Sequence, residues 1–192
     1  MEKVGVVFGG SRGIGKAVAQ LMAEKGYRLA IASRDLEVAK AAARNLGGNH
    51  LALRCDVAKE QDIQSAFAEM EKKLGRVNFL VNAAGINRDA LLLRTKTEDM
   101  ISQLHTNLLG SMLTCKAALK NMIQQQGGSI VNIGLIHTDM TKGMKEEQLK
   151  KNIPLGRFGE PSDVAQAVVF LLESPYITGH VLIVDGGLQL VL

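Results

Sequence analysis

The feature that most constrains the fold is a glycine-rich stretch near the amino terminus, which reads Val4-Gly-Val-Val-Phe-Gly-Gly-Ser-Arg-Gly-Ile-Gly15. Its first five residues are mostly apolar and predict a buried strand, and a helical period begins with Ile14, Val18 and Leu21. Because glycine has no Cβ, the chain between strand and helix can turn sharply and a phosphate can approach the backbone. The free N–H groups at the start of the helix would face that phosphate. The stretch therefore predicts a strand, a turn and a helix built around a phosphate-bearing ligand.

Length and composition limit the classes of protein to which this chain can belong. Its 192 residues, 46% of them hydrophobic, suffice for one compact domain over residues 1–192. A formal charge of +4 favours anionic partners such as nucleotides or acidic carrier proteins, but dispersed cations and 4% aromatic residues argue against nucleic-acid binding. The two cysteines and four histidines lack metal-ligand spacing, so we expect no metal site and reduced thiols in an intracellular compartment. No apolar run reaches membrane-spanning length, and the first strand begins too early to leave room for a cleavable signal.

Strand and helix patterns alternate along the chain. After the first strand, buried-strand runs are expected at residues 28–32, 51–54, 77–81 and 129–133, and a last one at 180–184. Helices are expected up to about residue 25, over 36–45 and 60–74, from a capping box at Thr95 and Glu98 to about residue 126, and after Pro161. Repeated strand, helix, strand units of this kind specify an α/β fold, a doubly wound parallel sheet with helices on both faces.

The end of the second strand is where such a fold selects its cofactor. An acidic side chain there binds a ribose 2′-hydroxyl, whereas a basic one accommodates a 2′-phosphate. Arg34, together with Arg12 in the glycine turn, favours NADPH; Asp35 argues against it but lies past the basic residue. The alternative is that Arg34 is a solvated loop charge. Asp56, just after the third strand, is placed either to accept a hydrogen bond from an adenine amino group or to serve as a turn residue or helix cap.

Several further motifs carry a resemblance to a known family. They are Gly9-x-x-x-Gly13-x-Gly15, Asp56, Asn82-Ala-Ala-Gly85, Asn107 within Thr-Asn-Leu-Leu-Gly110, and Val184-Asp-Gly-Gly187. Together they resemble the short-chain dehydrogenase/reductase family, and within it the 3-oxoacyl-[acyl-carrier-protein] reductases. The resemblance implies a Rossmann-type fold, NADPH as cofactor, and reduction of 3-oxoacyl thioesters, other carbonyls and quinones in fatty acid synthesis. It also implies a homo- or hetero-tetramer with related subunits in the mitochondrial matrix, with the cytoplasm as the alternative location.

The resemblance also implies roles for individual residues. Asn107 corresponds to the asparagine of the family's catalytic tetrad, which holds a water in the proton relay; alternatively it is a polar residue that kinks or caps its long helix. Asn82 and Gly85 would support the central strand and the cofactor. The residues expected to bind the cofactor are Gly9, Ser11, Arg12, Gly13, Ile14, Gly15, Arg34, Asp56, Val57, Asn82, Ala83, Ala84, Gly85 and Thr138.

The chain departs from the family where the remaining catalytic residues should stand. The family has a serine after the fifth strand, then Tyr-x-x-x-Lys on the next helix, and then a sixth strand. Here Leu135 occupies the serine position, and family-like sequence resumes at once near His137, which predicts an internal deletion near residues 134–137. The tyrosines are Tyr27 and Tyr176, and neither is followed four residues later by lysine. A histidine acid at His137 is conceivable, but Thr138-Asp139 is better explained as a helix cap.

This deletion should affect both folding and activity. A helix with its strand and turns takes roughly 30 or more residues. In the family the missing unit flanks the last strand and helps to form a subunit interface, so the last strand and Val164, Val168, Phe170 and Leu171 should lose apolar cover. Three functions follow: an active NADPH-dependent reductase, a catalytically silent NADPH-binding subunit, or a poorly folded splice-type deletion product. We expect catalysis to be impaired or absent, because the serine, tyrosine and lysine are missing.

Overall fold

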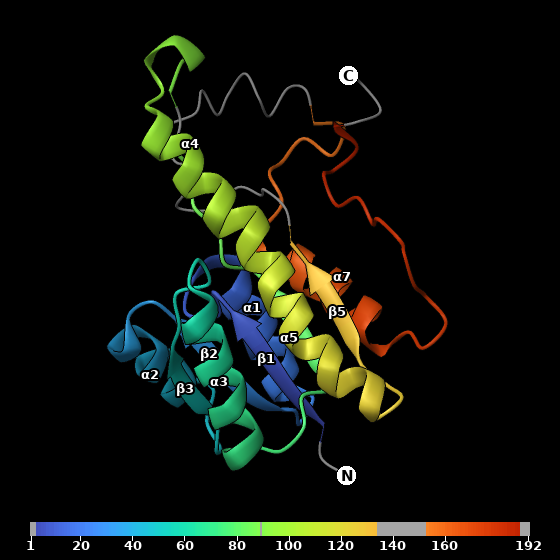
Figure 1. Ribbon diagram of the computed structural model, residues 1–192. Coiled ribbons are helices and arrows are strands. Elements are labelled where there is room, and N and C mark those ends of the chain that lie inside the picture. The colour runs from blue at the N-terminus through green and yellow to red at the C-terminus, as the bar shows by residue number, and fades with distance from the viewer. Residues whose placement is uncertain (1–2, 89, 134–152, 189–192) are drawn as a thin grey trace.

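The computed structural model describes residues 3–88, 90–133 and 153–188, and Figure 1 shows their arrangement. The first half of the chain alternates strands and helices: β1 Val4–Phe8, α1 Gly13–Glu24, β2 Arg28–Ser33, α2 Leu36–Asn45, β3 Leu51–Arg54, α3 Glu60–Lys73 and β4 Phe79–Asn82. A short 3-10 helix, η1 Leu92–Arg94, precedes a long helical rod made of α4 Thr97–Gln103, the π-helical stretch η2 Leu104–Leu109 and α5 Gly110–Gln124. The last described elements are β5 Ser129–Asn132 and α7 Pro161–Glu173.

The five strands form one parallel sheet in the order β3-β2-β1-β4-β5. Helices α1, α2 and α7 pack on one face, and α3 and α5 pack on the other, as the two views show together. This arrangement is the expected Rossmann-type α/β fold with a doubly wound parallel sheet. The chain reverses its direction of winding at β1 and β4, whose carboxyl ends lie side by side at the glycine turn.

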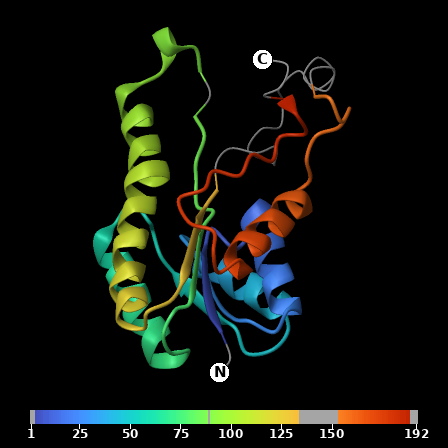
Figure 2. The same cartoon turned by 90° about the vertical axis from the view of Figure 1, so that its right-hand side faces the viewer.

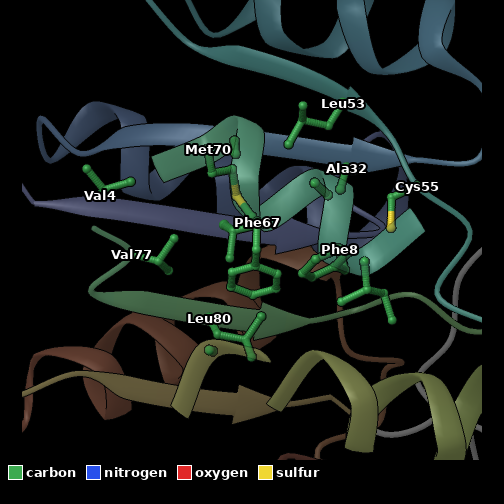
Figure 3. Close-up of a cluster of buried hydrophobic side chains, with 14 of the residues drawn as sticks. Val4, Phe8, Ala32, Leu53, Cys55, Phe67, Met70, Val77 and Leu80 are labelled. Carbon is green, nitrogen blue, oxygen red and sulfur yellow. The ribbon is translucent and has the colours of Figure 1, made fainter. Parts of the chain in front are cut away.

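Alternate residues of the central strand serve opposite faces of the sheet. Val6 and Phe8 of β1 belong to the core beneath α3 and α5, whereas Val7 belongs to the core beneath α1 and α7. Every residue of β1 is buried, which is why its sequence is almost continuously apolar. Figure 3 shows the first of these cores, in which the ring of Phe67 from α3 lies 6.0 Å from that of Phe8. The glycine turn is thereby anchored to a rigid strand.

Several predicted boundaries need correction. The strand expected at residues 77–81 runs from Phe79 to Asn82. The capping box expected at Thr95 and Glu98 is wrong: α4 begins at Thr97, and the Thr95 hydroxyl instead donates 3.1 Å to the carbonyl of Leu91. The helix expected to run unbroken to about residue 126 contains the π-helical stretch and ends at Gln124. The strand expected at 180–184 is not formed, since these residues are irregular and largely exposed.

The expectation that α7 loses its apolar cover is wrong for part of the helix. Val164 and Val168 are buried, because this face of α7 packs against α1 and the sheet. Phe170, on another face, is 56% exposed, and Leu171 is half-buried. The amino end of α7 is also secure, since Glu160 and Asp163 form a capping box. The helix therefore depends chiefly on elements that the described chain retains.

Beyond β5 the sheet has an open side. A groove of about 2130 Å³ runs along this strand, between α5 in one helical layer and α7 in the other, and the segment 177–185 forms its outer wall. The four residues of β5 are only partly buried or exposed, whereas all four residues of β4 are buried.

Candidate functional site

The glycine turn is held against the end of β4 by contacts that leave no room for side chains. Gly9 has a φ of +78°, and a Cβ added there would lie 2.6 Å from the backbone nitrogen of Ala84. A Cβ on Gly15 would overlap the carbonyl oxygen of Gly9 and lie 3.1 Å from the Cβ of Ala83. Gly13 has a φ of +54° and begins α1. These glycines are therefore required by backbone geometry, which confirms the tight strand, turn and helix predicted from their spacing.

The amino end of α1 is open toward the carboxyl edge of the sheet. Its N-cap residue, Arg12, makes no side-chain capping bond, and the first turn has no acidic residue. The first backbone N–H groups of a helix have no partner within the helix. Ile14, by contrast, is buried in the core, where it holds this turn against the sheet. The turn thus offers backbone donors and a positive dipole end without a competing carboxylate.

The end of β2 lies next to the glycine turn. The hydroxyl of Ser11 is 3.4 Å from that of Ser33, and Arg12 and Arg34 are both exposed beside these two serines in the sequence. The Asp35 carboxylate accepts hydrogen bonds from the N–H groups of Glu37 at 2.9 Å and Val38 at 3.3 Å. It is the N-cap of α2. This capping role gives a structural reason for the acidic residue that had argued against a 2′-phosphate.

The loop after β3 contributes Asp56 and Val57. Asp56 closes a turn, because its Oδ1 accepts a hydrogen bond from the N–H of Ala58 at 3.1 Å, while its own N–H donates to Asp62 at 3.0 Å. The turn alternative therefore describes its local bonding, and an adenine contact stays a prediction. Val57 is buried against α5, where a Cβ on Gly110 would lie 2.9 Å from Val57 Cγ2. Its side chain is thus part of the core.

Asn82 joins three elements at the carboxyl end of β4. It is buried, and its amide donates 2.8 Å to the Oδ1 of Asn132 at the matching position of β5. Its own Oδ1 accepts a hydrogen bond from the Thr114 hydroxyl of α5 at 2.8 Å. This network fixes the segment that follows, in which the Ala83 N–H donates 2.9 Å to the carbonyl of Phe8. Asn82 therefore supports the central strand, as expected from the resemblance.

Asn107 lies within the π-helical stretch η2 and binds the segment that follows β4. Its Nδ2 donates 2.8 Å to the carbonyl of Ile86, and its Oδ1 accepts from the N–H of Ile86 at 2.9 Å. Gly85 lies beneath it, since a Cβ there would be 3.5 Å from Asn107 Oδ1. The structure thus brings Asn107 to the same edge of the sheet as the glycine turn. Its role in a proton relay stays a prediction.

Neither tyrosine can replace the expected catalytic acid. Tyr27 precedes β2, so it lies at the amino ends of the strands, away from the glycine turn. There its hydroxyl donates 2.7 Å to Glu173. Burial, together with Glu173, raises the pKa of Tyr27 to about 12, which favours the protonated phenol. Tyr176 is fully exposed in the loop after α7. The predicted residues Leu135, His137, Thr138 and Asp139, and the expected deletion point, lie outside the described residues.

The thiols and carboxylates of the described chain suggest no other chemistry. Burial raises the pKa of Cys55 to about 12, with Asp62 and Asp56 adding to the effect, and burial also raises the pKa of Cys115. Thiols of this kind are poor nucleophiles near neutral pH. Within residues 3–88, 90–133 and 153–188, no group of acidic, histidine and cysteine side chains could hold a metal ion. In the same ranges, no helix is both long and apolar enough to span a membrane.

Sequence reasoning missed three partners of the site: Ile86, Thr114 and Asn132. One signal was available, because Asn82 directly follows the predicted strand 77–81 and Asn132 lies within the predicted strand 129–133, where an amide is unusual. Thr114 gave no such signal, since a threonine inside a helix is ordinary and only the tertiary structure shows that its hydroxyl reaches Asn82. Ile86 takes part through its backbone, which its side chain could not indicate.

Comparison with known proteins gives consistent matches. A family profile described as short chain dehydrogenase matches residues 3–146, and one described as Enoyl-(Acyl carrier protein) reductase matches residues 133–189. The chain is 64% identical to a human 3-oxoacyl-[acyl-carrier-protein] reductase, and the alignment covers all of both chains. It is 66% identical to the 3-oxoacyl-[acyl-carrier-protein] reductase of Mus musculus, over 99% of each chain. It is 54% identical to carbonyl reductase family member 4 of Xenopus laevis over 99% of each chain. The human alignment spans 237 positions, so at least 45 of them have no counterpart among these 192 residues.

Proposed function

Because this chain belongs to the short chain dehydrogenase family, we propose that it binds NADPH in the glycine turn and reduces 3-oxoacyl thioesters far more slowly than its relatives do. The observation that carries the first half is the fit between turn and phosphate: Gly9 and Gly15 leave the backbone bare, and the helix behind them begins without a capping carboxylate. The second half follows from the absence of Tyr-x-x-x-Lys in the sequence.

The turn supplies the contacts for the phosphates of the cofactor, and the two exposed arginines supply its specificity. A 2′-phosphate needs cationic partners at the end of β2, where Arg34 stands and where Arg12 lies in the adjacent glycine turn, while Asp35 accepts hydrogen bonds from N–H groups of α2. When bound, the cofactor would supply a hydride. Asn82 and Asn107 hold the segment between β4 and α4 in place, and they would thereby position one wall of the cofactor site.

Proton supply is the step that this chain lacks. Reduction of a carbonyl needs a proton at the oxygen, and a positioned general acid contributes roughly 10²–10⁴-fold in rate. The two tyrosines lie away from the site, and both thiols have raised pKa values. The shortfall of at least 45 aligned positions against the human relative supports a missing segment as the cause. We therefore expect cofactor binding without appreciable turnover.

A thermal-shift titration tests the cofactor assignment. NADPH should raise the melting temperature at lower concentration than NADH does. Arg34→Ala should weaken NADPH binding by about 10–100-fold, because a charge-assisted hydrogen bond is worth about 1.5–3 kcal/mol. The matched control is Arg44→Ala, which removes an exposed arginine from the last turn of α2. Equal effects of the two variants would show that Arg34 is only a solvated charge.

Turnover is then measured as NADPH consumption with a 3-oxoacyl thioester, using the human relative as the reference. We expect a rate at least about 10²-fold lower. A rate close to that of the human relative would refute the proposal that turnover is impaired. Absence of any shift with either nucleotide would instead favour a deletion product that does not fold into a binding site.

A second candidate function is a silent subunit that associates with related chains. The observation that favours it is an apolar stripe along the rod α4, η2 and α5, in which exposed side chains recur at intervals of one or two helical turns. These are Ile101, Leu104, Leu108, Met112, Leu119 and Ile123. Co-expression with the human relative, followed by affinity capture of one tagged chain, tests this function. Capture that Leu108→Lys abolishes, while Lys120→Ala leaves it intact, would support the subunit; no capture would exclude it.

A further inference from the structure

We propose that residues 180–184, which are irregular in the described structure, move onto the free edge of β5 in solution and form a sixth strand that closes the open side of the sheet. The inference concerns the edge of the fold and does not depend on NADPH binding. His180-Val-Leu-Ile-Val184 has the composition of a buried strand, yet it pairs with no strand among the described residues.

The segment is exposed in a way that its composition does not suit. Val181 is 82% exposed, Ile183 is 53% exposed, and Leu182 and Val184 are about two-fifths exposed. In an extended chain, Val181 and Ile183 point to one side and Leu182 and Val184 to the other. A run that is apolar on both sides is typical of a strand covered on both faces, as in a parallel sheet between two helical layers.

The groove beside β5 has two such layers. Its walls include Leu119 and Ile123 of α5 on one side and Val168 and Leu171 of α7 on the other. Leu119 and Ile123 are exposed in the described structure, so they lack the cover that a further strand would give. The strand β5 forms the inner wall, and its second edge has no strand partner in the described part of the chain. The occupant that this space fits is an extended segment with apolar side chains on both faces.

The segment 180–184 is already close to this position. It lines the same groove as β5. The carboxyl end of α7 lies at the start of β5, where the Ser129 hydroxyl donates 3.2 Å to the carbonyl of Leu172. From there the chain rises on the open side of β5 in the direction of its arrow, as Figure 1 shows. At its far end, Leu155 donates to the carbonyl of Gly186 at 3.2 Å. The segment thus starts near the beginning of β5 and runs in the same direction as this strand, which is the orientation that a parallel pairing requires.

Pairing would remove a hazard of this fold. A free strand edge offers unpaired N–H and C=O groups to other chains. The segment 180–184 competes for that edge at a much higher effective concentration than a second molecule does, because it is tethered at both ends. The added strand would let the sheet remain closed without the segment that this chain lacks relative to its relatives.

Hydrogen exchange of the full chain tests the pairing. The amides of residues 181–184 should exchange at least about tenfold more slowly than those of an unstructured peptide. Leu182→Pro should abolish this protection and increase exchange in β5, since proline removes a donor and fits poorly into a paired strand. Thr178→Pro, in the loop before the segment, is the matched control and should preserve it. Rapid exchange of 181–184 in the unaltered chain would overturn the proposal.

Cross-linking identifies the occupant of the edge. In a Cys115→Ala background, Val131→Cys is combined with Val181→Cys or with Ile183→Cys, so that two registers are sampled. Neighbouring strands bring Cα atoms within disulfide reach. One of these pairs should form a disulfide within a single chain, whereas Val131→Cys with Tyr176→Cys should not. Disulfides that link two chains would show that a second copy occupies the edge, and the absence of any disulfide would show that the segment stays apart; either result overturns the proposal.

Discussion

Replacing Gly15 by alanine tests the close packing on which the proposed cofactor site rests. The added Cβ would overlap the Gly9 carbonyl oxygen, lie 2.9 Å from its carbon and lie 3.1 Å from the Cβ of Ala83. These are backbone and first side-chain atoms, which cannot swing away as the end of a long side chain can. Forcing an extra methyl group into such a site costs about 1–3 kcal/mol. For a chain of this size, this corresponds to a melting temperature lower by about 2–12 °C.

The same substitution should weaken NADPH binding, because the turn must shift to accept the methyl group. We expect a Kd at least about tenfold higher, which corresponds to about 1.4 kcal/mol. Thermal unfolding with and without NADPH measures both effects. The control is Gly127→Ala, where an added Cβ would meet only the Gln125 carbonyl oxygen at 4.0 Å, and it should change stability by less than about 0.5 kcal/mol. If Gly15→Ala kept the melting temperature and the NADPH response of the unaltered chain, the packing argument would be wrong. If it lost stability but kept its NADPH affinity, the turn would be structural and the cofactor would bind elsewhere.

Three further predictions concern other parts of the fold. Asn82→Ala should lower the free energy of unfolding by about 1–3 kcal/mol, measured by urea denaturation, because it removes the buried amide that joins β4 to β5 and α5. The Arg157 guanidinium and then the Glu160 N–H hold the pKa of Asp163 down at about 2. The stabilising contribution of Asp163 is therefore present above the ordinary pKa near 4 and is lost as the pH falls toward 2. Asp163→Asn should flatten this acid dependence of stability, measured as urea midpoints. Burial raises the pKa of Tyr27 to about 12. The contribution of Tyr27 to stability is therefore fully present below the ordinary pKa of 10 and is lost as the pH rises toward 12. A Tyr27→Phe variant whose stability has the same alkaline dependence as the unaltered chain would contradict this assignment.

The sequence predicted the central strands well because β1 and β4 are wholly buried and β2 nearly so, which makes their sequences almost continuously apolar. The runs at 4–8 and 51–54 have the same bounds in the structure, and the helix expected at 36–45 is α2. The errors lie where local pattern and tertiary contact compete. Thr95 and Glu98 have capping-box spacing, but the 3-10 helix before them captures the Thr95 hydroxyl. The π-helical stretch around Asn107 was not predicted either, because no local signal distinguishes it from an α-helix.

The candidate site divides in a similar way. Gly9, Gly13 and Gly15 could be assigned from their spacing, because a missing Cβ has the same meaning in sequence and structure. Asp35 and Asp56 could not be resolved, since aspartate serves equally as a cap, a turn residue or a ligand contact. The structure shows that Asp35 caps α2 and that Asp56 closes a turn.

The packing of α7 supports our proposal that this chain binds a cofactor without appreciable turnover. Val164 and Val168 stay buried because they pack on the side of the sheet that carries α1, and Lys25 and Tyr27 bind Glu173 at its carboxyl end at 3.0 and 2.7 Å. The amino end of α1 belongs to the glycine turn. Because α7 packs against α1, it supports the helix on which the proposed cofactor binding depends. We propose that the general acid expected from the resemblance belongs to a segment that this chain lacks. Loss of such a segment would remove proton transfer, while the half of the fold that would hold NADPH keeps its own core.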